Sequence, residues 1–216
     1  MKKQNPNSRR DFLKKAAAAS TLFIVPRHVL GGVGYVAPSD QINLAAVGIG
    51  GKGTSDLRNA ARPKNVRVVG LCDVDTKGTV VKDVLRSQKD FPKATFYADF
   101  REMLDKEKDI DALTISTPDH THAAAAVYAM ERNKHVYVQK PLTHNVREAR
   151  ILTEMARNQK LVTQMGNQGA SNPDQLQVQK WVDSGVIGTI SEVKVWTNRP
   201  VWPQGVPMPE SDANMQ

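Results

Sequence analysis

A glycine-rich turn between an apolar strand and a helix constrains this chain more than any other feature. Residues 41–47 have the pattern of a short strand, and they lead directly into Gly48-Ile49-Gly50-Gly51-Lys52-Gly53. A helix-compatible segment, 54–61, and a second apolar strand, 66–72, come next, and Asp73 follows that strand. Strand, G-x-G-x-x-G turn, helix, strand and acid occur in the order that a dinucleotide-binding βαβ unit requires. The sequence therefore predicts an α/β fold with a Rossmann-type parallel sheet.

Each glycine of this turn has a physical role in such a unit. Gly48 permits the tight turn, Gly50 brings a diphosphate close to bare backbone, and Gly53 lets the helix pack against the strand. With Gly51, they place backbone N–H groups at a helix N-terminus, where the helix dipole favours an anion. Asp73 lies 20 residues after Gly53, where its carboxylate can accept ribose hydroxyls and repel a 2′-phosphate. These residues predict a site for NAD rather than NADP, and a generic strand–helix turn with a surface aspartate is the alternative.

Charge and composition argue against a nucleic-acid-binding protein. The 216 residues carry a net charge of +8, and 6% of them are aromatic. Residues 1–30 contain seven Lys or Arg and one acid, a net of +6, whereas the remainder has 23 basic and 21 acidic residues, a net of +2. The basic character thus belongs to the N-terminal segment and marks no surface for DNA or RNA. The single cysteine, Cys72, is expected to pack in the core.

The N-terminal segment has the pattern of an export signal. Arg9 and Arg10 are followed by Asp11-Phe12-Leu13-Lys14 and by a modestly apolar run, 16–25. A charged region before a short apolar one is typical of such signals, and the paired arginines resemble the twin-arginine signal. We expect the twin-arginine machinery to export the protein to the periplasm, and residues 1–35 are set aside as the signal region. A basic amphipathic arm is the alternative.

Strands and helices alternate through the following part of the chain. Apolar runs predict strands at 94–97, 110–116, 135–138 and 161–165, and helical spacing predicts helices at 76–89, 99–104, 121–131, 145–158 and 172–184. Asp75 and Asp99 are expected to cap the first two of these helices. Such alternation predicts a parallel sheet whose strands end at one common edge, where ligands bind. Polar clusters at 117–122, 139–141 and 166–168 fall at this edge, and residues 40–170 are assigned to the dinucleotide-binding domain.

The pattern changes after Gly188. Residues 189–197 alternate apolar and polar side chains, which predicts the first strand of a half-buried antiparallel sheet. Because a single strand cannot bury its own face, residues 171–216 are expected to begin an incomplete C-terminal domain for substrate binding and oligomerisation. The chain is accordingly expected to be a C-terminally truncated piece.

Several segments resemble the Gfo/Idh/MocA oxidoreductases, a family named for glucose–fructose and inositol dehydrogenase members. They are the glycine turn, the Ser-Thr-Pro-Asp-His-Thr-His turn at 116–122 and Gln139-Lys140-Pro141. Segments 165–169 and 200–205 are similar to those of secreted sugar-acting members. The resemblance implies NAD as cofactor, a sugar, glycoside or polyol as small-molecule substrate, and a homo-oligomer when the protein is full length.

The resemblance implies a catalytic role for Lys140. In the family, the lysine of a Glu-Lys-Pro segment lies beside the nicotinamide and the reacting sugar carbon. Oxidising a secondary alcohol needs a base for the hydroxyl proton, and a desolvated lysine near a cationic ring can act as one. A cis bond before Pro141 would fix its direction. Gln139 departs from the family's glutamate and leaves the detail of proton relay open.

Other residues of these turns are expected to contact cofactor or substrate. The resemblance places His122 beside the nicotinamide ribose, as a second candidate catalytic residue, and Thr117, Pro118 and His120 in the same cofactor-binding turn. Asn167 and Gln168 can hydrogen-bond sugar hydroxyls or the nicotinamide amide, or serve as turn formers. His120 and His122 also suggest a metal pair, but no third ligand cluster accompanies them, so no metal is expected.

Three functions fit these features. The first is an NAD-dependent oxidoreductase that transfers hydride between a tightly bound cofactor and a CH–OH group of a sugar. The second is an NAD-assisted glycoside hydrolase that oxidises C3 transiently and works by elimination, with no net redox change. The third is an inactive or sensory NAD-binding fragment.

Overall fold

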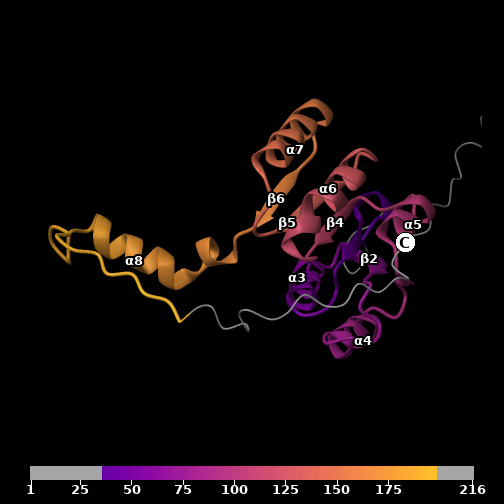
Figure 1. The fold of residues 1–216 in the computed structure, drawn as a ribbon, viewed down its shortest axis with the longest axis horizontal. Coiled ribbons are helices and arrows are strands. Elements are labelled where there is room, and N and C mark those ends of the chain that lie inside the picture. Colours follow the sequence, from indigo (N-terminus) through magenta and orange to yellow (C-terminus); the bar gives the residue numbers. More distant parts are fainter. Residues whose placement is uncertain (1–35, 199–216) are drawn as a thin grey trace, which may run out of the picture. The chain divides into compact units, whose positions relative to one another are not determined.

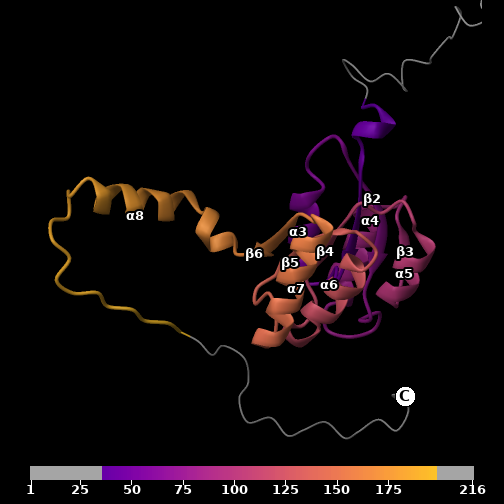
Figure 2. The same cartoon turned by 90° about the horizontal axis from the view of Figure 1, so that it is seen from above.

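The computed structural model describes residues 36–198. The predicted signal region, 1–35, and the segment 200–205 lie outside the described residues. The chain divides between Asn167 and Gln168 into two compact units, which are described separately. In the first unit, helices cover both faces of a parallel sheet (Figures 1 and 2).

Within residues 36–167, six parallel strands form one sheet in the order β3-β2-β1-β4-β5-β6. They are β1 (Ile42–Val47), β2 (Val66–Cys72), β3 (Thr95–Tyr97), β4 (Ala112–Ile115), β5 (His135–Gln139) and β6 (Thr163–Gly166). The strand order reverses between β1 and β4, and ligands of such sheets bind at this switch point. Val47 pairs with both Cys72 and Ile115, so the residues that follow these three strands meet at one edge. The predicted Rossmann-type sheet is confirmed.

Side chains of β1 alternate between the two faces of the sheet. Ala45 and Val47 join one buried cluster with residues of α5 (Phe100–Lys106), α6 (His122–Met130) and α7 (Val146–Gln159). Leu44 and Ala46 join a second cluster with residues of α3 (Lys52–Ala60) and α4 (Val81–Asp90). Figure 1 shows the two sets of helices on opposite sides of the strands. Burial on both faces explains why β1 is an almost continuous apolar run.

Helix N-caps agree with several of the predicted helix starts. The Asp99 carboxylate accepts the Arg101 N–H at 2.8 Å and caps α5. Asn145 and Glu148 form a capping box at the start of α7. Asn172 caps α8 (Pro173–Asp183), the helix of the second unit. Each such cap stabilises a helix by about 1 kcal/mol. Three short 3₁₀ turns complete the described elements: η1 (Pro38–Asp40), η2 (Asp119–Thr121) and η3 (Gln168–Ser171).

One predicted helix cap and one predicted strand are wrong. Asp75 does not cap α4, because its carboxylate accepts the N–H groups of Gly78 and Val80 and closes the turn before the helix. The helix begins only at Val81, where the helical spacing of apolar residues starts. Residues 189–198 contain no strand. A strand is held by hydrogen bonds to a neighbour, and the described part of residues 168–216 offers no partner strand.

The Cys72 side chain is buried, as predicted, with 2% of its surface exposed. Burial, followed by the nearby carboxylates of Asp73 and Asp99, raises the pKa of this thiol to about 12. The thiol is therefore neutral at physiological pH and serves as a small apolar group at the end of β2.

Candidate functional site

The glycine turn after β1 is shaped by close contacts that exclude side chains. Gly48 has a φ of +77°, and a Cβ there would lie 2.6 Å from the Ser116 carbonyl oxygen. A Cβ on Gly53 would overlap the carbonyl oxygen of Gly48, so α3 lies directly against the turn. These contacts support the roles predicted for the two glycines. Gly50 differs because its near neighbour is a side chain and not backbone. A Cβ there would lie 2.6 Å from Cγ2 of Val80.

The backbone N–H groups of this turn donate to two carboxylates. Ile49 and Gly50 donate to Oδ2 of Asp73 at 2.8 and 3.1 Å, and Gly51 donates to Oδ2 of Asp83 at 3.2 Å. The N–H groups of Gly50 and Gly51 are among those predicted to bind a diphosphate, and in this structure carboxylate oxygens accept from them. The N-terminus of α3 thus shows the expected preference for negative charge.

Asp73 keeps capacity to bind a ribose. Besides the two N–H groups of the turn, it accepts the Asp75 N–H on Oδ1 at 2.9 Å. A carboxylate has about four acceptor positions, so one further hydrogen bond from a hydroxyl can be accommodated. Its place at the end of β2, beside the turn, is the place from which the sequence predicts contact with the ribose.

A cavity of about 640 Å³ lies at the switch point, beside the glycine turn. This volume falls in the range of small-molecule sites, about 300–1,000 Å³. Six of the predicted site residues line it: Gly48, Gly50, Asp73, Thr117, Pro118 and His120. The sequence prediction missed its apolar wall, formed by Val74, Val80, Ala98, Phe100, Ala124 and Ala125. These residues follow β2 and β3 or lie at the starts of α4, α5 and α6, and this placement was the available signal.

The residues of this cavity fit an adenine dinucleotide. Thr117 lines the cavity, and its buried hydroxyl has no hydrogen-bond partner among the described residues. A buried hydroxyl without a partner is costly, so a polar ligand group at this position would stabilise it. The apolar wall suits a base, and Asp73 suits a ribose. Val80 covers Gly50, so close approach of a diphosphate to that glycine requires Val80 to move.

The structure buries His122, with 1% of its surface exposed. Its Nδ1 lies 2.6 Å from the Pro141 carbonyl oxygen, and its Nε2 lies 2.8 Å from that of Thr117. The ring therefore lies between the turn after β4 and the segment after β5, and a ring N–H donates to a carbonyl oxygen there. It does not line the cavity, so this position fits a positioning role rather than contact with substrate.

Lys140 follows β5 at the same edge of the sheet, and its side chain is exposed. The Lys140–Pro141 peptide bond is cis, as the resemblance implies. Lys140 does not line the 640 Å³ cavity. The backbone N–H of Lys140 donates to Oε1 of Gln139 at 2.8 Å.

Asn167 does not line the cavity. Asn167 is exposed after β6, and its N–H donates to the Met165 carbonyl at 2.9 Å. Gln168 begins the second unit. Their predicted contacts with substrate or nicotinamide stay predictions.

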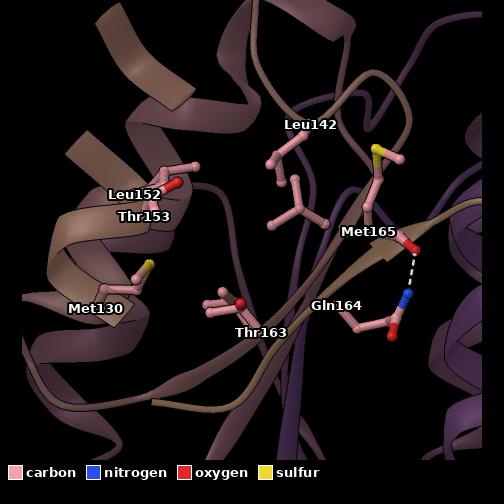
Figure 3. A pocket seen from close by; sticks show the side chains of 9 residues that line it. Met130, Leu142, Leu152, Thr153, Thr163, Gln164 and Met165 are labelled. Atoms are coloured by element: carbon pink, nitrogen blue, oxygen red, sulfur yellow. Dashed lines mark hydrogen bonds between the residues drawn. The ribbon is translucent and has the colours of Figure 1, made fainter. Parts of the chain in front are cut away.

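A smaller cavity of about 80 Å³ lies between the helices α6 and α7 and the strands β5 and β6. Figure 3 shows its lining, in which Met130, Leu142 and Leu152 point toward a common space and Gln164 donates to the Met165 carbonyl. Apolar side chains and two threonines make up most of its wall. No titratable group lines it, so it offers no chemistry for catalysis.

Two other kinds of site are absent from the part of the chain that the structure describes. Residues 36–198 contain no group of three or more His, Cys, Asp or Glu side chains that could hold a metal ion. Over the same residues, no helix has the length and apolar character needed to cross a bilayer.

Comparisons with known proteins agree with the fold. The family model GFO_IDH_MocA, described as an oxidoreductase family with an NAD-binding Rossmann fold, matches residues 42–167. A glycosyl hydrolase family 109 protein of Shewanella putrefaciens is 29% identical over 205 residues, covering 84% of this chain and 44% of that protein. The chain thus spans less than half the length of this relative.

Solved structures share the fold. Myo-inositol 2-dehydrogenase from Lactobacillus plantarum matches with a TM-score of 0.60 at 24% identity, over 69% of this chain and 43% of that one. An NAD-binding protein from Listeria innocua matches with a TM-score of 0.58 at 25% identity, over 68% of this chain and 42% of that one.

Proposed function

The chain belongs to the GFO_IDH_MocA oxidoreductase family, and from this premise we propose that the full-length protein is an NAD-dependent oxidoreductase acting on a CH–OH group of a sugar, glycoside or polyol. The observation that supports this most is the juxtaposition at the switch point. The glycine turn, Asp73 and the Thr117–Pro118 turn surround one cavity, and Lys140 follows the adjacent strand.

In this proposal the glycine turn holds the diphosphate, Asp73 holds the adenosine ribose, and the Thr117 hydroxyl bonds a polar group of the cofactor. The negative charge of Asp73 favours NAD, because a 2′-phosphate beside it would be repelled. When bound, the cofactor accepts or returns the hydride. Lys140 takes the proton of the substrate hydroxyl, and His122 holds the two turns together through the Thr117 and Pro141 carbonyls.

Location and assembly are part of the same proposal. The paired arginines at 9 and 10 support export by the twin-arginine route to the periplasm. A cofactor used there would be carried tightly bound and recycled within each turnover. The full-length protein would be a homo-oligomer, as the resemblance implies.

A second candidate is an NAD-assisted glycoside hydrolase. The 29% identity over 84% of this chain to a glycosyl hydrolase family 109 protein favours it. Transient oxidation at C3 allows elimination of the leaving group, addition of water and reduction, so that the hydride returns to the sugar and no net redox change occurs. Lys140 would act as the base in this reaction as well.

One assay separates these candidates. Full-length protein loaded with NAD is incubated with sugars, polyols and aryl glycosides, and NADH absorbance and free sugar are measured together. NADH formation without sugar release supports the dehydrogenase, and sugar release without net NADH supports the hydrolase. Bound NAD with neither product supports the sensory alternative and overturns both enzymatic proposals.

Lys140→Ala tests the base, with Lys93→Ala as the control because Lys93 is an exposed lysine far from the edge. We expect Lys140→Ala to reduce turnover by about 10²-fold or more, the range of a general base, while the dissociation constant of NAD stays within about twofold. Retained turnover in Lys140→Ala would remove this residue from the catalytic role.

A further inference from the structure

A buried carboxylate on α3 has no part in the function proposed above. Asp56 is 5% exposed, and its Oδ2 accepts the Ser116 hydroxyl at 2.9 Å and the Gln139 amide Nε2 at 2.8 Å. Its Oδ1 pairs with Nζ of Lys52 at 2.9 Å. Burying a charge is costly unless it is paired and hydrogen-bonded, and these three partners meet that requirement.

Gln139 connects this carboxylate to Lys140. Its side chain is 5% exposed, and while Nε2 donates to Asp56, Oε1 accepts the Lys140 backbone N–H at 2.8 Å. Both ends of the amide are engaged, so its orientation is fixed by its donors and acceptors. A glutamate at 139 would place a second carboxylate within hydrogen-bond distance of Asp56. The neutral glutamine avoids this contact between like charges and donates to Asp56 instead.

We propose that Asp56 is a positioning residue for Lys140. Its carboxylate holds the Gln139 amide, which fixes the backbone of Lys140. Through Ser116 the same carboxylate ties the end of β4 to the end of β5, so the cofactor turn and the lysine keep one relative position. This inference rests on the proposed function for its catalytic consequence, but its structural part does not depend on any activity.

The test exchanges the carboxylate and the amide between positions 56 and 139. Asp56→Asn, Gln139→Glu and the double variant Asp56→Asn/Gln139→Glu are made in the full-length protein. Asp105→Asn is the control, because Asp105 lies on the surface, where it pairs with Arg132. Each variant is assayed for kcat, KM and NAD affinity between pH 5 and pH 8.5. The substrate is the one identified in the assay with sugars, polyols and aryl glycosides.

We expect Asp56→Asn to lower kcat about tenfold or more, with KM and NAD affinity within about twofold, because substrate binding does not involve this residue.

In Gln139→Glu, two like charges in one buried site raise the apparent pKa of the pair. The correct geometry is then kept at low pH, where one proton is shared, and lost as pH rises through that raised value. Activity should fall about tenfold between pH 5.5 and pH 8 relative to the wild type.

The double variant restores one carboxylate and one amide, so its kcat should return to within about threefold of the wild type, without the added pH dependence. A double variant no better than Gln139→Glu, or an Asp56→Asn variant with unchanged kcat, would overturn the inference.

Amide hydrogen exchange of the Lys140 N–H, followed by NMR, separates this inference from the proposed function. It should quicken about tenfold or more in Asp56→Asn and Gln139→Glu and recover in the double variant. If the wild type turns over no sugar while exchange follows this pattern, the proposed function fails and the positioning of the segment stands. If the exchange rate of the Lys140 N–H is the same in Asp56→Asn as in the wild type, the inference fails whatever the activity.

Discussion

Gly53→Ala sets two effects of opposite sign against each other. Alanine in place of glycine inside a helix is worth up to about 1 kcal/mol in favour of the variant. The new Cβ, however, would overlap the Gly48 carbonyl oxygen and lie 2.8 Å from its carbonyl carbon. These are backbone atoms of a tight turn and cannot move as a flexible side chain would, and such overpacking costs about 1–3 kcal/mol or more.

The steric contact with Gly48 should outweigh the gain in helix propensity. We expect a net loss of about 1–2 kcal/mol, which lowers the thermal midpoint by about 2–8 °C for a protein of this size. Displacement of the turn should also weaken NAD binding about tenfold, which corresponds to about 1.4 kcal/mol. Thermal unfolding followed by circular dichroism and a fluorescence titration with NADH measure the two effects.

Gly169→Ala is the matched control, because a Cβ at Gly169 would meet no atom within 4 Å. Its stability should stay within about 0.5 kcal/mol of the wild type. If Gly53→Ala is as stable as the wild type, or more stable, and binds NADH equally well, then helix propensity outweighs the contact and the packing argument for this glycine is refuted.

Three further predictions concern two carboxylates and a thiol near the turn. Asp73→Asn should lower the preference for NAD over NADP about tenfold in parallel titrations, because the repulsion of a 2′-phosphate is lost; an unchanged ratio would place the carboxylate away from the ribose. Asp83→Asn keeps an acceptor for the Gly51 N–H but removes a negative charge, and it should tighten NAD binding about fivefold at low salt, less at high salt; weaker binding would contradict this. Cys72, whose pKa is raised to about 12, should resist alkylation at pH 8 in folded protein and react in urea. Because its folded pKa lies above the unfolded value, its contribution to stability is complete below about pH 9 and is lost as pH rises toward 12, which urea unfolding at pH 8 and 10 can check.

The sheet and the cofactor turn were accessible from the sequence because local patterns specify them. Glycines 48 and 53 each face a backbone atom that leaves no room for a Cβ, and this is the type of constraint that a short motif records. The parallel arrangement of the strands followed from the alternation of strands and helices, whereas their order is seen only in the structure. Asp75 misled the prediction because an aspartate near a helix start can close the preceding turn as well as cap the helix.

The partners of the site carboxylates were not accessible from sequence, because they depend on tertiary contacts. Gln139 and Asp56 are separated by 83 positions, and no short motif links them. A partial signal existed: the buried residues of α3 include Gly53, Asp56 and Leu57, whose spacing places the aspartate on the apolar face of the helix. A charge on that face implies a partner at the sheet edge, but only the fold identifies it.

The two carboxylates at the glycine turn also bear on how tightly a cofactor can be held. A diphosphate that takes the Gly51 N–H must replace the Asp83 oxygen, so the measured affinity is the difference between phosphate and carboxylate as acceptors at a helix N-terminus. Asp73 follows β2 and accepts three backbone N–H groups, whereas Asp83 lies on α4 and accepts one of the turn, that of Gly51. We therefore expect Asp83 to be the group that gives way, together with Val80 on the same segment. In this account, residues 80–83 set the cost of cofactor entry, while Asp73 keeps the turn in place and selects the ribose.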